Sequence, residues 1–420
     1  MTFSKLQLDP AILSAVDDAG YSEPTPIQAA AIPVILKGRD MIGIAQTGTG
    51  KTAAFTLPLL SLLAQRKPQG KGIRALIVAP TRELVTQIRD NIQTYSKNLN
   101  LKIAAIYGGV GERPQIQALR QGAEIVIATP GRLIDLMDQG HVRFDGIEFF
   151  VLDEADRMLD MGFLPPIRKI ARKLPQHRQS LFFSATLSKQ IEQLSKDFLN
   201  KPEKVEIGRR SNPADTVEQS IYELPKHLKF EMLVKLLEKQ EFYSVLVFCG
   251  MKHQADRISK RLRQHEIESQ AIHGNRSQNQ RQRALDSFKS GDLRVLVATD
   301  VAARGIDVSG VTHVINYDFP SQNEDYIHRI GRTGRAGQDG TAITFIEPGQ
   351  QRDLFHLEKF IKRELPRVID EDFDYSVPAP PREERPPRGP RQPRQQRSPR
   401  GGGSGGGSDK SARKRSRRRR

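Results

Sequence analysis

The stretch Ala45-Gln46-Thr47-Gly48-Thr49-Gly50-Lys51-Thr52 constrains the fold of this chain more than any other segment. It follows a short apolar run, 41–44, and precedes a helix-forming segment, which indicates a glycine-rich turn between a buried strand and a helix. The backbone N–H groups of such a turn wrap phosphates. Lys51 can then reach the outer phosphates, and the Thr52 hydroxyl can ligate Mg²⁺. Ala45 stands where the general pattern has glycine, so an ordinary turn before a helix remains the alternative.

A second motif, Asp153-Glu154-Ala155-Asp156, directly follows the apolar run 149–152. That position places acidic side chains at the carboxyl end of a strand, where a nucleotide-bound metal would lie. Alone, the motif is also typical of the start of a helix, because Asp and Glu favour the positive end of the helix dipole. Together, the two motifs predict a nucleoside triphosphatase.

Short apolar runs alternate with longer amphipathic segments from residue 40 to about 208, and the alternation resumes after residue 245. This rhythm predicts parallel sheets with crossover helices. A polar, proline-containing stretch separates the two series, so we expect a first domain at 1–207, a linker at 208–217 and a second domain at 218–368. The expected strands are 41–44, 75–78, 103–106, 125–128, 149–152 and 181–183, then 245–248, 271–272, 295–298, 314–316 and 342–345.

Positive charge is concentrated at the C-terminal end. From residue 377 onward there are 15 Lys and Arg against 3 Asp and Glu, so +12 of the total charge of +17 lies there. The same segment is rich in Pro, Gln, Gly and Ser and lacks apolar periodicity, which predicts a disordered basic tail at 369–420. The charge favours a polyanionic partner, and nucleic acid before a membrane, because no amphipathic helix accompanies it.

The only cysteine in the sequence, Cys249, ends the apolar run 245–248, so we expect a buried structural thiol and no disulfide. The N-terminus has no apolar signal core, and no apolar run approaches the length of a membrane span. These features predict a soluble protein in a reducing compartment, the cytoplasm.

Further polar residues follow other expected strands of the first domain. These are Pro-Thr-Arg-Glu-Leu at 80–84, Gly-Gly at 108–109 and Thr-Pro-Gly-Arg at 129–132. Such junctions meet along one edge of a parallel sheet. Short hydroxyls, glycine amides and single arginines favour contacts with phosphate over the reading of bases. Taken one at a time, each is more typical of a turn or a helix cap, whereas three on one edge favour phosphate contacts.

Two arginines in the second half, Arg332 and Arg335, lie within a helical pattern that starts near Tyr326. Their spacing puts them on one helical face unless the neighbouring glycines end the helix first. They lie far from Lys51 in the sequence and on another domain, which is the arrangement required of arginine fingers that complete a triphosphate site when two domains close. A solvated basic face is the alternative.

The order of these motifs resembles the DEAD-box family of ATP-dependent RNA helicases, and within it the bacterial RhlE-like group. The segment Gly20-Tyr21-Ser22-Glu23-Pro24-Thr25-Pro26-Ile27-Gln28, with Phe3 upstream, is similar to the adenine-reading segment of the family. Ser184-Ala185-Thr186 is similar to its linking motif, and Ala45 is normal for the family. The resemblance covers nearly all of residues 1–368 and implies two tandem RecA-like domains.

The resemblance also implies roles for single residues. Phe3 would stack on adenine and Gln28 would bind its edge, while Asp307 would touch the ribose. In the catalytic group, Asp153 would hold Mg²⁺ through water, Glu154 would deprotonate the attacking water, and Arg332 and Arg335 would neutralise the transferred phosphoryl group. Ser184 and Thr186 would couple hydrolysis to strand separation, and His328 would help tie the domains together. The RNA groove would contain Arg82, Gly109, Thr129, Arg132 and Thr299.

The expected function is therefore local unwinding of RNA duplexes, driven by RNA-stimulated hydrolysis of ATP with Mg²⁺, in ribosome assembly or RNA decay. Two rival functions are a DNA helicase or translocase on the same fold and a non-enzymatic RNA chaperone. The tail is expected to tether RNA nonspecifically, and a purely solubilising extension is the alternative.

Overall fold

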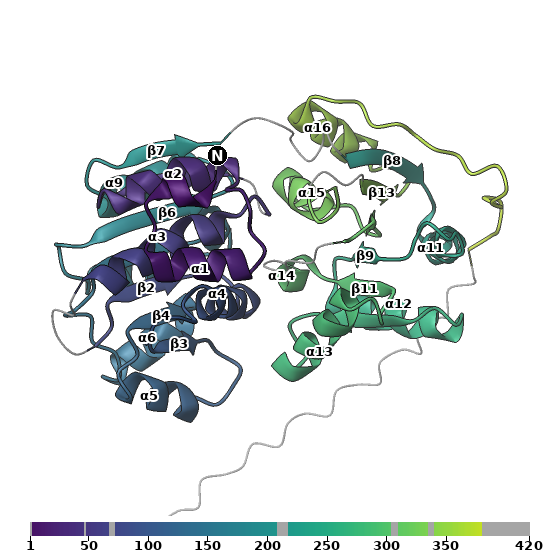
Figure 1. The fold of residues 1–420 in the computed structure, drawn as a ribbon. Coiled ribbons are helices and arrows are strands. Elements are labelled where there is room, and N and C mark those ends of the chain that lie inside the picture. Colours follow the sequence, from purple (N-terminus) through teal and green to yellow (C-terminus); the bar gives the residue numbers. More distant parts are fainter. Residues whose placement is uncertain are drawn as a thin grey trace, which may run out of the picture. The chain divides into compact units, whose positions relative to one another are not determined.

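Two parallel β-sheets organise the chain in the computed structural model, which describes residues 2–45, 48–66, 72–207, 217–303, 310–334 and 340–379. The first sheet has seven strands in the order β3-β4-β2-β5-β6-β1-β7, and the second has six in the order β10-β11-β9-β12-β13-β8. Every strand pair in both sheets is parallel. The α/β architecture expected from the alternation of the sequence is confirmed (Figure 1).

The strands of the first sheet are β1 (Met41–Ile44), β2 (Ala75–Val78), β3 (Ile103–Ile106), β4 (Ile125–Ala128), β5 (Phe149–Leu152), β6 (Gln179–Ser184) and β7 (Glu203–Glu206). Its helices are α1 (Pro10–Asp18), α2 (Pro26–Leu36), α3 (Lys51–Gln65), α4 (Arg82–Tyr95), α5 (Arg113–Arg120), α6 (Pro130–Asp138), α7 (Ala155–Asp160), α8 (Leu164–Ala171) and α9 (Lys189–Phe198), preceded by the 3₁₀ turn η1 (Phe3–Leu6).

The second sheet contains β8 (Val217–Glu223), β9 (Val245–Phe248), β10 (Ser269–Ile272), β11 (Val295–Ala298), β12 (His313–Asn316) and β13 (Gly340–Ile346). Its helices are η2 (Lys226–Leu228), α11 (Lys229–Leu237), α12 (Lys252–Gln264), α13 (Gln278–Lys289), α14 (Asp300–Ala303), α15 (Asn323–Ile330) and α16 (Gln351–Ile361). None of the helices in the described ranges is long and apolar enough to cross a membrane.

Burial on both faces explains why the central strands read as continuous apolar runs. In β5, Phe149 and Val151 pack in one hydrophobic cluster with α1 to α4, whereas Phe150 and Leu152 pack in another with α6 to α9. Successive side chains of a strand point to opposite faces, so each sheet covered by helices on both sides needs apolar residues at every position. The second sheet is likewise covered by two clusters.

Two edge strands, β7 and β8, were not predicted. The sequence of β7 is Glu-Lys-Val-Glu, and its side chains are exposed or half-buried. In β8, the buried residues Val217, Gln219 and Ile221 alternate with more exposed ones. Edge strands bury less surface than central strands, so their polar residues obscure the apolar signal. Because β8 begins at Val217, this residue belongs to the second sheet and not to the linker, and residues 208–216 lie outside the described ranges.

The folded part also extends further than predicted, to about Val377. Backbone bonds join Ile221 of β8 to the segment after α16: its N–H donates to Pro366 O, and Val368 N–H donates to its carbonyl oxygen. Phe373 and Tyr375 then pack against the cluster that contains α11. The start of the predicted tail, 369–377, is therefore bound to the second domain, because its aromatic side chains supply the apolar surface that the rest of the tail lacks. Residues 380–420 lie outside the described ranges.

Cys249 is fully buried, as predicted, and burial raises the pKa of its thiol to about 12. At pH 8, roughly one thiol in 10⁴ would then be ionised, and the thiolate is the reactive form. We expect Ellman's reagent to leave Cys249 unlabelled in the folded chain at pH 8 and to label it fully in guanidinium chloride. Rapid labelling of the native protein would contradict the buried position.

Candidate functional site

The glycine-rich turn lies between β1 and α3, as predicted. Gly50, the residue before α3, has φ 90° and Gly48 has φ 81°, a left-handed conformation that favours glycine. A Cβ atom on Gly50 would lie 2.5 Å from the Gln28 amide nitrogen, so the turn has no room for a side chain there. The first N–H groups of a helix have no partner within it, so the start of α3 is suited to bind an anion. Thr49 belongs to this turn, whereas Thr47 lies outside the described residues.

Lys51 is almost completely buried, and its ammonium group donates a hydrogen bond of 2.5 Å to the Ala45 carbonyl oxygen. Burial lowers the pKa of Lys51, while the nearby carboxylates of Asp153 and Glu154 act in the opposite direction. A buried cation at the start of a helix is well placed to attract a polyanion, because the low local dielectric strengthens the interaction.

Asp153 and Glu154 follow β5 and are both buried. Burial, together with the charge of Glu154, raises the pKa of Asp153 to about 7, so a cation beside this carboxyl group would favour its charged form. Burial also acts to raise the pKa of Glu154, but the Arg157 guanidinium outweighs it and holds this pKa below its ordinary value. Arg157 Nη1 donates to Glu154 Oε2 over 2.6 Å. Glu154 therefore remains a carboxylate at neutral pH.

Glu154 adopts φ 52°, a left-handed conformation that is uncommon for a residue with a side chain. Such a conformation costs on the order of 1 kcal/mol and tends to occur at functional sites. The left-handed conformation of Glu154 lies between the end of β5 and the start of α7. After this bend, the carboxyl groups of Asp153 and Glu154 line the same cavity as Lys51.

Asp156 connects the acidic motif to the segment Ser184–Thr186. Its Oδ2 atom accepts hydrogen bonds from the backbone N–H groups of Ala185, at 2.9 Å, and Thr186, at 3.0 Å. The Ser184 hydroxyl donates to the Thr186 carbonyl oxygen over 2.7 Å. The catalytic acidic motif and the segment predicted to couple hydrolysis to strand separation are therefore in direct contact through Asp156, which was not among the predicted site residues.

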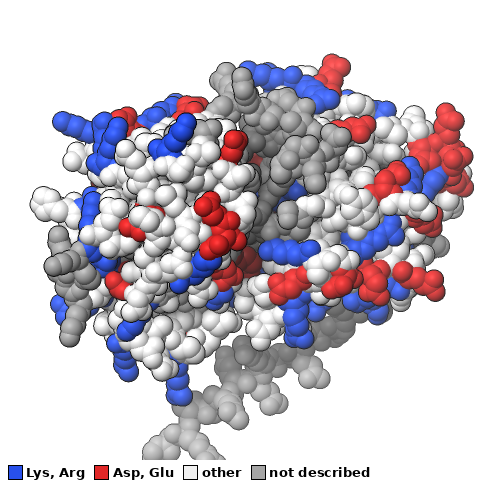
Figure 2. Space-filling model, viewed as in Figure 1, with Lys and Arg blue, Asp and Glu red and all other residues white. Residues whose placement is uncertain are grey.

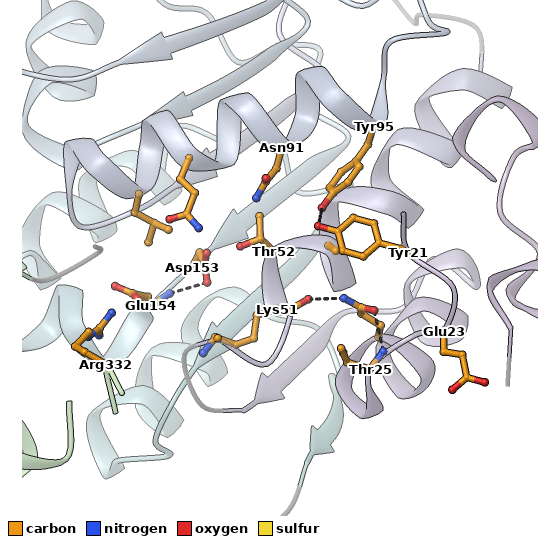
Figure 3. A pocket seen from close by; sticks show the side chains of 16 residues that line it. Tyr21, Glu23, Thr25, Lys51, Thr52, Asn91, Tyr95, Asp153, Glu154 and Arg332 are labelled. Carbon is orange, nitrogen blue, oxygen red and sulfur yellow. Dashed lines mark hydrogen bonds between the residues drawn. The ribbon is translucent and has the colours of Figure 1, made fainter. Parts of the chain in front are cut away.

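A cavity of about 340 Å³ brings these groups together (Figure 3). Lys51, Thr52, Asp153 and Glu154 from the first domain line it, and so does Arg332 from the second domain. Helix α15 ends at Ile330, so Arg332 follows the helix, and the glycine at 331 does end the helical pattern. Arg335 and Asp307, the other second-domain residues predicted for this site, lie outside the described residues.

The other end of the cavity contains the predicted adenine-reading segment. Gln28 accepts a hydrogen bond from the Thr25 N–H and donates one to the Gly50 carbonyl oxygen, so it connects this segment to the glycine-rich turn. Phe3 was predicted to stack on adenine, but it is only 4% exposed and belongs to the core beneath α2. Tyr21 lines the cavity instead and accepts a hydrogen bond from the Tyr95 hydroxyl at 3.4 Å.

The residues predicted for an RNA groove lie at the carboxyl ends of neighbouring strands. Arg82 begins α4, and its guanidinium occupies the space where Gly109 would carry a side chain. Arg132 Nη1 donates to the Val110 carbonyl oxygen over 3.4 Å, which brings it to the same loop. Thr129 precedes α6 after β4. In the second domain, Thr299 follows β11 in the same way.

The two domains also contact each other through buried polar groups. Glu83 Oε1, on the first turn of α4, lies 3.0 Å from Arg281 Nη2 and accepts a hydrogen bond of 3.1 Å from the Gln278 amide, both on α13. His328 of α15 is half-buried, and the loss of solvent around it, reinforced by the charge of Arg157, lowers its pKa to about 4. His328 is therefore neutral near pH 7 and lies close to the acidic motif of the first domain, and its role in joining the domains stays a prediction.

Comparison with known proteins identifies the fold family. The DEAD/DEAH box helicase family model matches residues 25–194, and the model of the helicase conserved C-terminal domain matches residues 228–337. The chain belongs to the DEAD-box family of ATP-dependent RNA helicases. As a DEAD-box protein, it is an RNA helicase with ATPase activity.

Relatives from distant organisms match most of the chain. The ATP-dependent RNA helicase CshA of Limosilactobacillus reuteri is 42% identical over 367 residues, which cover 87% of this chain and 73% of that protein. DEAD-box ATP-dependent RNA helicase 20 of Arabidopsis thaliana is 46% identical over 364 residues, covering 86% and 73% respectively. The family inferred from the sequence is thus confirmed.

Solved DEAD-box structures share the fold. S. cerevisiae Dbp5 bound to RNA and ADP BeF3 superposes with a TM-score of 0.78 at 32% identity, covering 87% of this chain and 95% of that one. Mss116p bound to ssRNA and AMP-PNP superposes with a TM-score of 0.80 at 29% identity, covering 88% and 80%. The predicted architecture of two tandem RecA-like domains is confirmed.

The residues around the cavity fit a magnesium nucleotide. A glycine turn without space for side chains and a buried lysine suit a triphosphate. Within the described ranges there is no group of three or more His, Cys, Asp or Glu side chains that could hold a metal ion by themselves. One carboxylate, Asp153, and one hydroxyl, Thr52, instead suit Mg²⁺, which retains waters and binds phosphate oxygens in such sites.

Sequence reasoning missed three residues of this DEAD-box site: Tyr21, Asp156 and Arg157. Tyr21 lay within a motif already recognised, but its position at the cavity, with an exposure of 45%, was not visible in the sequence. Asp156 and Arg157 lie within four residues of Asp153, so their closeness in the sequence to the predicted catalytic carboxylates could have indicated that they belong to the site. Their bonding partners, in contrast, depend on the fold.

Proposed function

We propose that the protein couples RNA-stimulated ATP hydrolysis at the cavity of Figure 3 to local separation of short RNA duplexes. One observation carries the proposal: the phosphate-binding lysine and both carboxylates of the first domain share a cavity with Arg332 of the second. A catalytic set divided in this way is complete only while the domains are together. Solved relatives that bind RNA together with a nucleotide analogue support the same reading.

Each group has a distinct task in this proposal. The turn N–H groups and Lys51 bind the phosphates, and Thr52 and Asp153 would hold Mg²⁺, which would supply charge neutralisation at the reacting phosphoryl group. Glu154, kept ionised by Arg157, orients a water molecule and accepts its proton. Arg332 donates to the oxygens on which charge develops. Tyr21 and Gln28 bind the base, and Tyr21 takes the stacking role that the sequence had suggested for Phe3.

RNA would cross the carboxyl edges of both sheets. Arg82, Gly109, Thr129 and Arg132 from the first domain and Thr299 from the second would contact phosphates and sugars, which gives little sequence preference. Because RNA and ATP both favour the closed arrangement, each must tighten the binding of the other. The contact of Asp156 with Ser184–Thr186 offers a direct route between the two sites.

ATP hydrolysis measured with RNA, with DNA and without nucleic acid tests the proposal. We expect strong stimulation by RNA of unrelated sequences and little by DNA, because 2′-hydroxyl contacts distinguish RNA. Stimulation by DNA alone would favour a DNA translocase. Strand annealing without any ATPase activity would favour a chaperone that acts through basic charge, in which Lys51, Glu154 and Arg332 would have no role.

We further propose that the protein acts in the cytoplasm and belongs to the RhlE-like bacterial group, in ribosome assembly or RNA decay. The soluble character expected from the sequence and the order of its motifs support this placement. Crosslinking the protein to RNA in its own cells, followed by sequencing of the bound RNA, would identify the process.

The basic tail is proposed to tether RNA. Acidic and basic side chains are interspersed on the face of the folded part shown in Figure 2, whereas residues from 377 onward carry +12 of the charge. Because residues up to Val377 pack on the second domain, the deletion should start at 378. Removal of 378–420 is expected to weaken RNA affinity and to reduce the slope of log K against log salt, measured by fluorescence anisotropy. An unchanged affinity and slope would leave solubilisation as the tail's role.

A further inference from the structure

Helix α4 forms a second wall of the nucleotide cavity. Leu84, Gln87, Asn91 and Tyr95 all line it, at spacings that place them on one face of the helix. In Figure 3 this face lies across the cavity from Lys51 and Thr25, while Tyr95 on the same face contacts Tyr21. None of the roles assigned above to catalysis or to base binding accounts for the two amide side chains in the middle of this wall.

Asn91 is the side chain of this wall whose position is most informative. Figure 3 shows its amide directed into the cavity, toward Thr52 of α3. Asn91 is half-buried, whereas Gln93 and Thr94 on the far side of the same helix are exposed. Within the described residues, the Asn91 amide has no hydrogen-bond partner in the protein. A polar group held in a cavity in this way is satisfied by water or by a ligand.

The ends of the cavity determine which part of a nucleotide Asn91 would meet. Tyr21 marks the base end, and Lys51 with Asp153 marks the phosphate end (Figure 3). Asn91 lies one turn before Tyr95, which contacts Tyr21 at the base end, and its amide points toward Thr52 on α3 (Figure 3). It therefore lies between the base end and the phosphate end, in the region that the sugar of a bound nucleotide spans. An amide both donates and accepts hydrogen bonds, so it matches a pair of ribose hydroxyls.

We propose that Asn91 is a further nucleotide-binding residue whose side-chain amide contacts the ribose hydroxyls. The proposal rests on the proposed function of the cavity as the ATP site. It also explains why α4 carries amides at a position where a helix facing α3 would otherwise be apolar. Because α4 begins with Arg82 and Glu83, the same helix also contributes to the RNA groove and to the contact with the second domain.

The test compares dissociation constants of ADP and 2′,3′-dideoxy-ADP, measured with Mg²⁺ by calorimetry. Asn91→Ala is expected to weaken ADP binding about fivefold to tenfold, the size of one or two lost hydrogen bonds. It should leave the dideoxy nucleotide, already a weaker ligand, within twofold of its affinity for the unsubstituted chain. Alanine favours the helix more than asparagine does, so unfolding would not explain the loss.

Gln93→Ala is the matched control, because Gln93 is exposed on the same helix, and it should change neither affinity. The proposal is overturned if Asn91→Ala leaves ADP binding unchanged, or if it weakens both nucleotides equally. These results differ from a failure of the proposed function itself, which would appear as the absence of ADP binding by the unsubstituted chain.

Discussion

Lys51→Ala is expected to abolish ATP hydrolysis and duplex unwinding, with a loss of roughly 10³-fold or more in the RNA-stimulated rate. The substitution removes the buried ammonium group beside Asp153 and Glu154, and with it the cation that the phosphates would meet at the start of α3. Nucleotide-free RNA binding should stay close to that of the unsubstituted chain, because Lys51 is buried away from the residues predicted for the RNA groove. Phosphate release and strand displacement measure the two effects.

Lys169→Ala is a suitable control for Lys51→Ala. Lys169 is exposed on α8, where it pairs with Asp138 at the surface, so its loss should alter neither hydrolysis nor unwinding. Thermal unfolding of both variants checks that the fold is retained. If the Lys51→Ala variant kept its fold and still unwound duplexes, this cavity could not be the site of the ATP hydrolysis that drives unwinding.

Arg332→Ala is expected to produce the second large loss, roughly 10³-fold to 10⁵-fold in the single-turnover rate of hydrolysis. Arg332 is buried at the cavity although it comes from the other domain. The affinity for ADP should change only a few-fold, since the first domain supplies the other nucleotide contacts. A selective loss of rate would indicate that Arg332 acts mainly in the transition state.

Two comparisons sharpen the Arg332 experiment. Arg332→Lys keeps the charge but loses the planar fork of donors, so an intermediate rate is expected. Arg352→Ala, an exposed arginine on α16 of the same domain, should have no effect. A rate for Arg332→Ala equal to that of the Arg352 control would exclude a catalytic contribution from the second domain at this residue.

The central strands were predictable because burial on both faces leaves a strong apolar signal. All eleven predicted strands are present, and the largest extensions are polar positions such as Gln179 and Ser184 in β6. Of the edge strands in the described sheets, β3 and β10 were predicted from their apolar residues, whereas β7 and β8 were not, because several of their polar side chains remain exposed or half-buried. The C-terminal boundary was misplaced because a few aromatic residues, Phe373 and Tyr375, suffice to bind an otherwise polar segment.

Within the site, the approach of Lys51 to Asp153 could be predicted because the carboxyl ends of parallel strands share one edge. The burial of Phe3 and the position of Tyr21 at the cavity could not be predicted, since spacing alone does not tell which of two aromatic residues packs in the core. The pair of Glu83 with Arg281 was equally inaccessible. Its members are charged residues on different domains, and only the tertiary structure brings them together.

The central claim is that one catalytic set is divided between two domains. ATP hydrolysis by residues 1–207 alone tests it most directly, because this fragment keeps Lys51, Asp153, Glu154 and the hydrophobic clusters of its own sheet but lacks Arg332. Binding of ADP confirms that the fragment is folded. The account predicts a rate at least about 10²-fold below that of the RNA-stimulated intact chain, and no response to RNA. Hydrolysis by the fragment as fast as by the intact chain, with or without RNA, would contradict it.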